Sequence, residues 1–335
     1  MNMASSAYTL LNSYQAREHI NALSEAGQQF LFIVDFKGEN SIVIPVDDIN
    51  SNDIIYQIGA NSNESNEIVN KLEDLLKWDV FPVSEQEYQL KFEYIQQQIL
   101  LGNSFLTNLT QPSKVHTNLS LSQLYSFGSA KYKLWLKDQF VVFSPETFVR
   151  IEGQTISSYP MKGTIDASIP NAEQIILNDP KEKAEHATIV DLIRNDLSLV
   201  AENVEVKRYR YVEKLTTNKQ DLFQVSSEIS GQLPLDFHKN LGDILFALLP
   251  AGSICGAPKA KTLEIIEHAE NYDRGFYTGV CGYFDGKNLD SAVMIRFIEQ
   301  DGDSLVFKSG GGITAQSDMK KEYEELIQKI YVPIS

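Results

Sequence analysis

The sequence predicts an α+β protein in which antiparallel strands and helices are interspersed without a regular βαβ repeat. Strand-like alternation dominates from residue 104 to 159, where "KLWLKDQFVVFSP" and "TFVRIEGQTISSY" are typical of hairpins. Further along, apolar residues at helical spacing predict helices near 180–198, 237–249, 257–270 and 317–331, interspersed with strands at 274–284, 291–300 and 304–312.

The residue pattern divides the chain into two parts. Residues 1–82 contain the strand-like runs "QQFLFIVDF" and "NSIVIPV", followed at 47–67 by a polar stretch rich in Asn and Ser that predicts a loop. From about residue 85 a helical pattern runs up to Gly102, which is well suited to end a helix. With 335 residues and 43% hydrophobic content, the chain can bury a sizeable core. We expect residues 1–82 to be integrated into the same fold as the main domain, 83–335.

The composition excludes several classes of function. The formal net charge is −16 and Lys and Arg form no cluster, which argues against nucleic acid as a partner. No apolar run of about 18 residues appears and the first residues lack a secretory pattern, so we expect a cytoplasmic protein that does not enter a membrane. Cys255 and Cys281 are too few for a disulfide framework and are expected to be buried free thiols. An anionic substrate would require a locally positive site.

The segment "NDPKEKAEHATIVDLIRNDL" predicts a helix that carries a carboxylate on its apolar face. Asp179 can cap this helix, and Glu182 stands at the spacing of a capping box. Glu185 lies on the same helical face as Ile189. Burying a carboxylate there destabilises the fold by on the order of several kcal/mol unless the carboxylate is paired. Its partner is either a bound cation or an arginine such as Arg194.

The C-terminal segment "SDMKKEYEELIQKI" predicts a second helix with carboxylates beside its buried face. Glu322 and Glu325 project together along one edge of that face. A solvated face with a Glu325 to Lys329 pair is the alternative interpretation. The helix follows "KSGGGITAQ", whose glycines 310–312 can let backbone amides approach a ligand or can simply form a turn. Together with Glu185, these groups are what a hard, oxygen-seeking Mg²⁺ site requires.

Two cations stand in positions that suit an anion. In "AGSICGAPKAKTLEIIEHAE", a helix beginning near Pro258 offers free N–H groups to an anion beside Lys259, although helix initiation explains Pro258 equally well. Arg296 lies in the middle of the predicted strand "SAVMIRFIE", where its guanidinium needs a carboxylate from a structural Glu or from a ligand.

Lys162, in "YPMKGTID", stands at the end of a predicted strand, where a turn needs only Pro160 and Gly163. Its motif is one of an ordered series: "SPE" at 144–146, "PMKGT" at 160–164, "EHATIVDLIRND" at 185–196, "GSICGAPK" at 252–259, "RGFYTGVCGY" at 274–283, "AVMIR" at 292–296, and "GGGIT" followed by "EYEE". This order resembles the chorismate-utilising enzymes, the family of anthranilate, aminodeoxychorismate and isochorismate synthases, over residues 85–331. The resemblance implies two mainly antiparallel β-sheets packed as a sandwich with helices on the outside, and a chorismate-binding catalytic domain at 83–335.

With lysine at position 162, the motif resembles that of the aminodeoxychorismate synthase component I branch. The anthranilate and isochorismate branches typically carry alanine there. The resemblance implies that the Lys162 amine attacks C2 of chorismate and expels the C4 hydroxyl. Ammonia then enters at C4 and releases the lysine, which gives 4-amino-4-deoxychorismate, the precursor of p-aminobenzoate for folate. The attacking amine must be neutral, and burial or a nearby positive charge favours that form. A solvated turn lysine is the alternative interpretation.

The resemblance also assigns an acid and a metal site. Hydroxide is a poor leaving group, so its departure needs a general acid, and the family match gives this role to Glu146, with a hydrogen-bonding role at a strand end as the alternative. Mg²⁺ is assigned to Glu185 and Glu325 directly and to Glu182 and Glu322 through water. Mn²⁺ fits the same oxygens.

The substrate's two carboxylates are expected to be its anchors. The ring carboxylate is assigned to the metal and to the amides of the glycine run, and the enolpyruvyl carboxylate to a tyrosine and an arginine. The expected substrate-binding residues are Tyr277, Arg296, Gly311, Gly312, Thr164 and Lys259.

The chain departs from the family pattern in three places, which affect the fine contacts to substrate. Leu106 stands where many relatives have glutamine, Gln224 stands where relatives often have histidine, and "PMKGTID" lacks the arginines that frequently follow this motif. No glutaminase signature appears, so the resemblance implies that ammonia comes from a separate glutamine amidotransferase partner. Anthranilate synthase component I, a lyase that also eliminates pyruvate, is the nearest alternative. A non-catalytic chorismate-binding protein is the alternative of another class.

Overall fold

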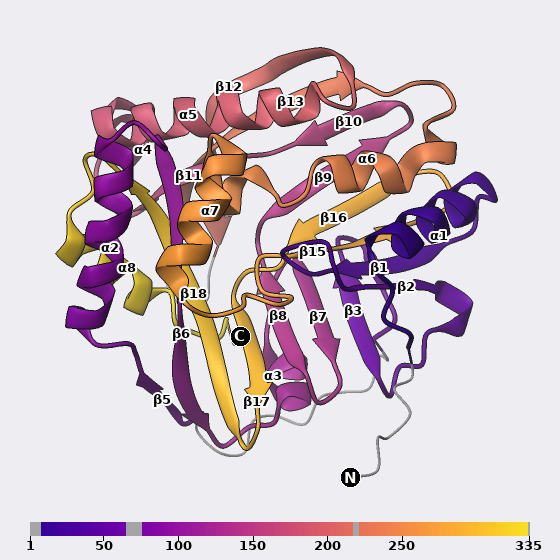
Figure 1. Cartoon of the computed structure of the whole chain (residues 1–335), viewed down its shortest axis with the longest axis horizontal. Helices are drawn as coiled ribbons and strands as arrows, with labels where there is room; N and C mark the ends of the chain where they lie inside the picture. Colours follow the sequence, from indigo (N-terminus) through magenta and orange to yellow (C-terminus); the bar gives the residue numbers. More distant parts are fainter. Residues whose placement is uncertain (1–7, 65–75, 217–220, 334–335) are drawn as a thin grey trace.

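The strands of the protein form two large antiparallel sheets. The computed structural model describes residues 8–64, 76–216 and 221–333 (Figure 1). The first sheet has the order β11 (Met161–Asp166), β13 (Asp221–Gln232), β10 (Thr155–Ser158), β9 (Thr147–Glu152), β16 (Leu289–Val293), β15 (Val280–Phe284), β1 (Phe30–Val34) and β2 (Ser41–Pro45), and β12 (Glu202–Thr216) also pairs with β13. The second has the order β14 (Gly256–Ala257), β6 (Leu106–Thr117), β18 (Ser304–Thr314), β17 (Phe297–Asp301), β8 (Phe140–Ser144), β7 (Tyr132–Leu136), β3 (Ile54–Ile58) and β4 (Asn61–Ser62), and β5 (Trp78–Phe81) also pairs with β6.

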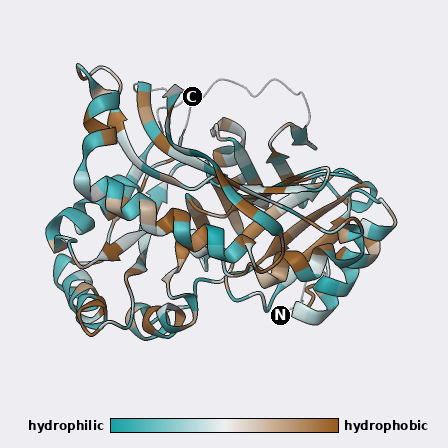
Figure 2. Cartoon of the chain, turned by 90° about the horizontal axis from the view of Figure 1, so that it is seen from above, coloured by the Kyte–Doolittle hydropathy of each residue, from teal (hydrophilic) through white to brown (hydrophobic). Residues whose placement is uncertain are grey.

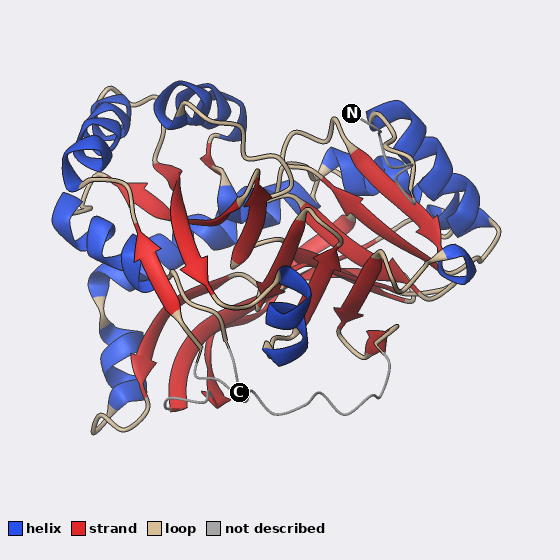
Figure 3. Cartoon of the chain, turned by 90° about the horizontal axis from the view of Figure 1, so that it is seen from below, coloured by secondary structure: helices blue, strands red, loops and turns tan. Residues whose placement is uncertain are grey.

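Helices lie mainly on the outside of the two sheets, as Figure 3 shows in blue against the red strands. The α-helices are α1 (Ser13–Glu25), α2 (Glu85–Leu100), α3 (Leu121–Phe127), α4 (Ala172–Asn178), α5 (Pro180–Leu197), α6 (Leu241–Ala247), α7 (Lys259–Glu270) and α8 (Met319–Gln328). Short 3₁₀ helices are η1 (Val46–Asp48), η2 (Phe237–Asn240) and η3 (Gly252–Ile254). Many helices show both teal and brown segments in Figure 2, as expected of helices with one face against a sheet.

The hydrophobic core explains this layered arrangement. Ile33 of the first sheet and Phe140 and Phe297 of the second belong to one buried cluster, which fills the space between the sheets. A second cluster packs α1, α5 and α6 against the first sheet. A third packs α2, α7 and α8 against β6 and β18. The sequence prediction of an α+β sandwich with external helices is therefore confirmed.

Several local predictions can be compared with the structure. The segments 133–145 and 147–159 form the hairpins β7–β8 and β9–β10, as expected. Asp179 accepts a hydrogen bond from the Glu182 N–H at 3.0 Å and so caps α5, and α2 ends two residues before Gly102, whose φ is +79°. Cys255 and Cys281 are free and buried, also as expected.

The prediction of a loop at 47–67 is wrong for part of that stretch. It contains β3, in which Ile54, Tyr56 and Ile58 are buried and alternate with more exposed residues, and the short β4. The neighbouring Asn and Ser residues hide this short alternation in the sequence, and the pairing of β3 with β7 decides its structure. Residues 65–67 lie outside the described part of the chain.

Strands of the first 82 residues pair with strands far along the chain. β1 pairs with β15 in the first sheet, and β3 pairs with β7 in the second. Within the described ranges, no helix is long and apolar enough to cross a membrane.

The backbone passes from one sheet to the other at two places that matter for the site. β8 belongs to the second sheet and β9 to the first, so the crossing falls at Pro145 and Glu146. β16 belongs to the first sheet and β17 to the second, so the other crossing falls at residues 294–296. Arg296 is therefore not in the middle of a strand, as the sequence suggested, because the chain leaves one sheet before it and enters the other after it.

A buried ion pair joins helix α7 to the strands beneath it. The Arg274 guanidinium donates to both carboxylate oxygens of Glu270, at 2.6 and 2.8 Å, and to the backbone carbonyls of Asn108 and Ile254, each at 3.0 Å. Both charged side chains are almost fully buried, with 1% and 2% of their surface exposed. The Glu270 carboxylate also accepts a hydrogen bond from the Thr110 N–H at 2.7 Å. The pair therefore fixes α7, β6 and η3 together.

Replacing Glu270 with glutamine removes the charge partner of a buried guanidinium, and we expect a loss of about 3–5 kcal/mol in the free energy of unfolding. Equilibrium unfolding in urea measures this loss. Glu264→Gln is the matched control on the same helix, because the Glu264 pair with Lys261 is exposed, and it should leave the unfolding midpoint unchanged. Equal midpoints for Glu270→Gln and the wild type would contradict the role given to the pair.

Candidate active site

A cavity of about 600 Å³ lies where helices α5 and α8 meet the ends of strands from both sheets. Its walls come from β11, β18, α5, α8 and both sheet crossings. Most of the residues expected from the sequence line it: Glu146, Lys162, Thr164, Glu182, Glu185, Tyr277, Arg296, Gly311, Gly312, Glu322 and Glu325. Lys259 is the exception.

Lys162 reaches the cavity from a bulged strand. The register of β11 on β13 shifts between Lys162 and Thr164, and Gly163 between them has a φ of +79°. A Cβ atom at Gly163 would lie 2.8 Å from Oε2 of Glu182, the end of a side chain that can turn aside, so the positive φ is the main reason for glycine at this position. Lys162 Nζ lies 3.7 Å from Oε2 of Glu185, and the lysine side chain is 26% exposed. This lysine belongs to the cavity wall and is not a solvated turn residue.

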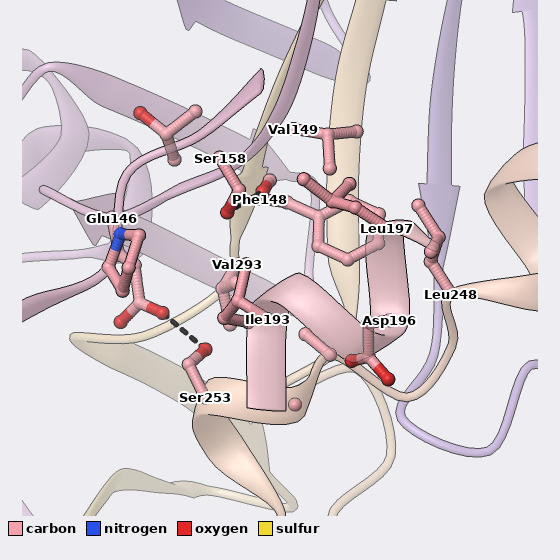
Figure 4. Close-up of a pocket in the computed structure, with 14 residues that line it drawn as sticks. Glu146, Phe148, Val149, Ser158, Ile193, Asp196, Leu197, Leu248, Ser253 and Val293 are labelled. Carbon is pink, nitrogen blue, oxygen red and sulfur yellow. Dashed lines mark hydrogen bonds between the residues drawn. The ribbon is translucent and has the colours of Figure 1, made fainter. Parts of the chain in front are cut away.

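Glu146 lies at the crossing from β8 to β9 and is held by two contacts. Its backbone carbonyl accepts a hydrogen bond from the Val293 N–H at 3.1 Å, and its carboxylate accepts one from the Ser253 hydroxyl (Figure 4). Burial raises the pKa of the Glu146 carboxyl, and the Ser253 hydrogen bond and the charges of Lys162, Lys329 and Arg296 oppose that rise. A carboxylic acid with a raised pKa is suited to give up a proton near neutral pH.

Two pairs of carboxylates reach the cavity from two helices. Glu182 and Glu185 come from α5, and Glu322 and Glu325 come from α8. A Cβ atom at Gly311 would lie 3.6 Å from Oε2 of Glu322 and 4.0 Å from Oε1 of Glu325, so both α8 carboxylates face the same point of β18.

These carboxylates fit a divalent cation in kind, because Mg²⁺ prefers oxygen ligands of this type. They are not gathered around one point: within residues 8–64, 76–216 and 221–333, no three acidic, His or Cys side chains form a group that could hold a metal.

Lys329 connects the α8 carboxylates to the strand beside them. Its ammonium donates to Oε1 of Glu325 at 2.7 Å and to the carbonyl of Gly310 at 2.9 Å. Burial lowers the pKa of Lys329, and the nearby Glu325 carboxylate opposes that change. The Glu325 to Lys329 pair that the spacing suggested does form, but it borders the cavity and is not confined to a solvated face. Glu322 is buried and accepts a hydrogen bond from Ser317 at 2.7 Å.

The glycine run is part of strand β18, in agreement with the strand predicted at 304–312, and the alternative that it forms a turn is wrong. Gly310, Gly311 and Gly312 pair with residues 108–110 of β6. A Cβ atom at Gly310 would lie 2.5 Å from the Leu109 carbonyl, and one at Gly312 would lie 3.5 Å from Lys162 Nζ. The absence of side chains therefore allows close strand packing and leaves the cavity open beside the lysine.

Arg296 and Tyr277 lie together at the second crossing. Arg296 has a φ of +54°, which is strained for a residue with a side chain. Its guanidinium carbon lies 5.1 Å from the centre of the Tyr331 ring, and it forms no ion pair with any described carboxylate. Tyr277 is buried and lines the same cavity, and burial raises the pKa of its hydroxyl. A half-buried guanidinium of this kind is suited to bind a carboxylate of a ligand.

The remaining expected residues lie at the edge of the cavity or outside it. Thr164 is exposed at the rim of the cavity, opposite Gln224 in the strand register. Lys259 lies outside the cavity: its ammonium bonds Asp196 at 2.9 Å and the Leu248 carbonyl at 3.2 Å. The first turn of α7 thus points its lysine at a neighbouring helix. Arg194 pairs with Asp191 on its own helix.

Sequence reasoning missed several residues of the cavity. Lys308 lines it and binds Glu299 at 2.7 Å, while Asn108, Thr278 and Ser253 contribute polar groups. Ser253 had a signal, since it lies within the motif "GSICGAPK", but its contact with Glu146 spans 107 residues of sequence.

The two-sheet α+β fold thus places a lysine, a carboxyl of raised pKa and a guanidinium without a described carboxylate partner around one cavity. The model of the chorismate binding enzyme family matches residues 44–335. The chain therefore belongs to the chorismate binding enzyme family, and the resemblance found in the sequence is confirmed.

Comparison with individual proteins supports the family and leaves the reaction open. The chain is 49% identical to an uncharacterized PabA-like protein of Pasteurella multocida, over 95% of this chain and 98% of that one. It is 32% identical to aminodeoxychorismate synthase component 1 of Bacillus subtilis, over 75% of this chain and 55% of that one. It is also 32% identical to anthranilate synthase component 1 of Archaeoglobus fulgidus, over 74% and 61%.

The solved structure of MenF, the menaquinone-specific isochorismate synthase from Escherichia coli, has the same fold. It matches with a TM-score of 0.74 at 15% identity, over 96% of this chain and 82% of that one.

Replacing Ser253 with alanine removes a hydrogen bond that favours the ionised form of Glu146, so we expect the pKa of Glu146 to rise further. Ser253→Thr keeps the hydroxyl and should leave that pKa as in the wild type. Carbon-13 NMR of the side-chain carboxyl, assigned with a Glu146→Gln variant, measures the titration. A pKa that stays the same or falls in Ser253→Ala would show that the contact does not stabilise the carboxylate.

Proposed function

We propose that this protein is the ammonia-using component of aminodeoxychorismate synthase, which converts chorismate and ammonia to 4-amino-4-deoxychorismate. One observation supports this reaction over those of anthranilate and isochorismate synthases. The amine of Lys162 lines the same cavity as the carboxyl of Glu146. An amine can form a covalent bond to the substrate, and a carboxylic acid of raised pKa can protonate the group that leaves.

The first half of the proposed reaction attaches the substrate to the enzyme. The lone pair of Lys162 Nζ forms a bond to C2 of chorismate, the ring double bonds shift, and the bond from C4 to its hydroxyl oxygen breaks. Glu146 donates its proton to that oxygen, so that water leaves and a carboxylate remains. Glu185, 3.7 Å from the amine, helps to hold the lysine within the cavity.

The second half exchanges lysine for ammonia. Ammonia forms a bond to C4, the double bonds shift back, and the bond from C2 to Nζ breaks, which returns lysine as a neutral amine. The new C4 ammonium gives a proton to the Glu146 carboxylate, so the acid is restored. One chorismate and one ammonia are consumed, and one aminodeoxychorismate and one water are formed.

The charges around the cavity support binding of a substrate with two carboxylates. Lys162, Arg296, Lys308 and Lys329 all line the cavity, although the whole chain has a net charge of −16. Arg296, without a described carboxylate partner, is the proposed anchor of the enolpyruvyl carboxylate, next to Tyr277. Because five glutamates line the same cavity, the further positive charge that a second substrate carboxylate needs would have to come from a bound cation.

We further propose that the site binds Mg²⁺, with Glu185 and Glu325 as direct ligands and Glu182 and Glu322 acting through water. Binding would require these side chains to move closer together than they are in this structure, where they are not gathered around one point. When bound, the ion would supply positive charge that neutralises the ring carboxylate. Glu325 would exchange its contact with Lys329 for the metal. The ammonia is proposed to come from a separate glutamine amidotransferase chain, a role supported by the likeness to component 1 of aminodeoxychorismate synthase.

Lys162→Ala removes the proposed nucleophile, and we expect the formation of aminodeoxychorismate to fall by about 10³-fold or more. The assay combines chorismate, MgCl₂ and ammonium, and the product is identified by mass. Lys261→Ala, which removes an exposed lysine of α7, is the control and should keep wild-type activity. A covalent adduct trapped at Lys162 would support the role directly, whereas full turnover by Lys162→Ala would end it.

The same assay separates this function from that of anthranilate synthase. Anthranilate and pyruvate as the products of the wild-type protein would replace the proposed function, and no product at all would favour a chorismate-binding protein without catalysis.

Glu325→Gln weakens a proposed metal ligand, so we expect weaker binding of Mg²⁺ and a smaller rise in thermal stability when MgCl₂ is added. Glu324→Gln is the matched control, because Glu324 is exposed on the same helix and does not line the cavity. Isothermal titration calorimetry with MgCl₂ gives the affinity in the absence of substrate. Unchanged affinity in Glu325→Gln, or no binding by the wild type, would count against the site.

A further inference from the structure

A second, much smaller chamber adjoins the large cavity at Glu146 and Ser253. Figure 4 draws the residues that line this chamber. Both residues line both spaces, so their hydrogen-bonded side chains stand between them. The chamber has a volume of about 20 Å³, which is enough for one molecule the size of water or ammonia.

The lining of the chamber favours a neutral occupant. Apart from Glu146 and Ser253 it is mostly apolar, with Phe148, Val149 and Ile193 among its walls. An ion without a partner is costly in such surroundings, whereas a small neutral molecule with hydrogen-bonding groups is not.

The other polar groups that border the chamber already have partners. The Ser158 hydroxyl donates to the Phe148 carbonyl at 3.0 Å, and the Asp196 carboxylate is bound to Lys259 at 2.9 Å. Glu146 and Ser253 are bonded to each other, but they also line both spaces, so they are the polar groups that a molecule in the chamber and a substrate in the cavity can both reach.

The proposed reaction involves two small neutral molecules beside this acid. The water formed at C4 takes its proton from Glu146, and the ammonia that replaces it must reach the same carbon while the ring of the substrate is covalently held by Lys162. Both events need room next to Glu146 for one molecule at a time.

We propose that this chamber, bounded by Glu146, Ser253, Ile193 and Ala251, is the subsite through which the leaving water and the incoming ammonia exchange. The inference rests on the proposed function. In the exchange, water departs with the proton of Glu146. The lone pair of ammonia then forms the C4–N bond as the C2–Nζ bond breaks, and the surplus proton returns to the Glu146 carboxylate.

A variant that fills the chamber tests the proposal. Ala251 is buried in its wall, and Ala251→Val adds two methyl groups. We expect the KM for ammonia to rise by about tenfold while the KM for chorismate stays within about twofold of wild type. Ala16→Val is the matched control, since Ala16 is equally buried in the same hydrophobic cluster but does not border the chamber.

A variant that enlarges the chamber tests it in the opposite direction and does not depend on tolerance of a larger side chain. Ile193→Ala removes part of the wall, so methylamine, which is one carbon larger than ammonia, should become a better substrate relative to ammonia. The expected product is the N-methyl derivative of 4-amino-4-deoxychorismate, identified by mass. Thermal unfolding shows that each variant is folded.

The outcomes separate the two levels of the proposal. If the wild-type protein makes aminodeoxychorismate, but folded Ala251→Val keeps its KM for ammonia and Ile193→Ala keeps its preference against methylamine, the chamber proposal alone is overturned. If the wild type makes no amino product from ammonium, the proposed function fails and the chamber proposal fails with it.

Discussion

The site depends on two backbone hydrogen bonds that fix the chain where it crosses between the sheets. The Val293 N–H donates to the Glu146 carbonyl and the Phe143 N–H donates to the Arg296 carbonyl, each at 3.1 Å. Glu146 of the first crossing is thus bonded to Val293 of β16, just before the second crossing. Arg296 of the second crossing is bonded to Phe143 of β8, just before the first. Because both neighbouring sheets restrain these residues, an acid and a guanidinium are held at one cavity with little freedom to move. Such fixed geometry is what a site needs in order to stabilise developing charge without first reorganising.

The cavity brings acidic and basic side chains close together. Four cationic side chains line it, Lys162, Arg296, Lys308 and Lys329, and so do five glutamates: Glu146, Glu182, Glu185, Glu322 and Glu325. Burial acts on the acid and on a base in opposite directions, since it raises the pKa of Glu146 and lowers that of Lys329. In both cases it favours the neutral form. The burial that forms the core therefore also changes the acid–base properties of side chains at the cavity.

Local patterns were predicted well because neighbours in sequence decide them. The cap at Asp179, the end of α2 before Gly102 and the two hairpins around Glu146 need only a few residues each. Predictions that depended on distant neighbours were less successful. The glycine run lies in the predicted strand and does not form the alternative turn, because β6 pairs with it, and Lys259 turned away from the cavity toward Asp196 of α5.

The sequence by itself determined the fold class and the family, and most of the site residues that it proposed do line the cavity, since motifs and alternation of apolar residues can be recognised along the chain. Only the tertiary structure decided how those residues meet. The Ser253 hydroxyl bonds the carboxylate of Glu146, which is 107 residues away in the sequence. The Lys162 amine lies beside Gly312 of β18, which has no side chain to fill the space. These contacts, and the small chamber beside the acid, arise where two sheets and two helices converge. No pattern along a single segment contains the distance between atoms on different elements, and packing of the core fixes that distance.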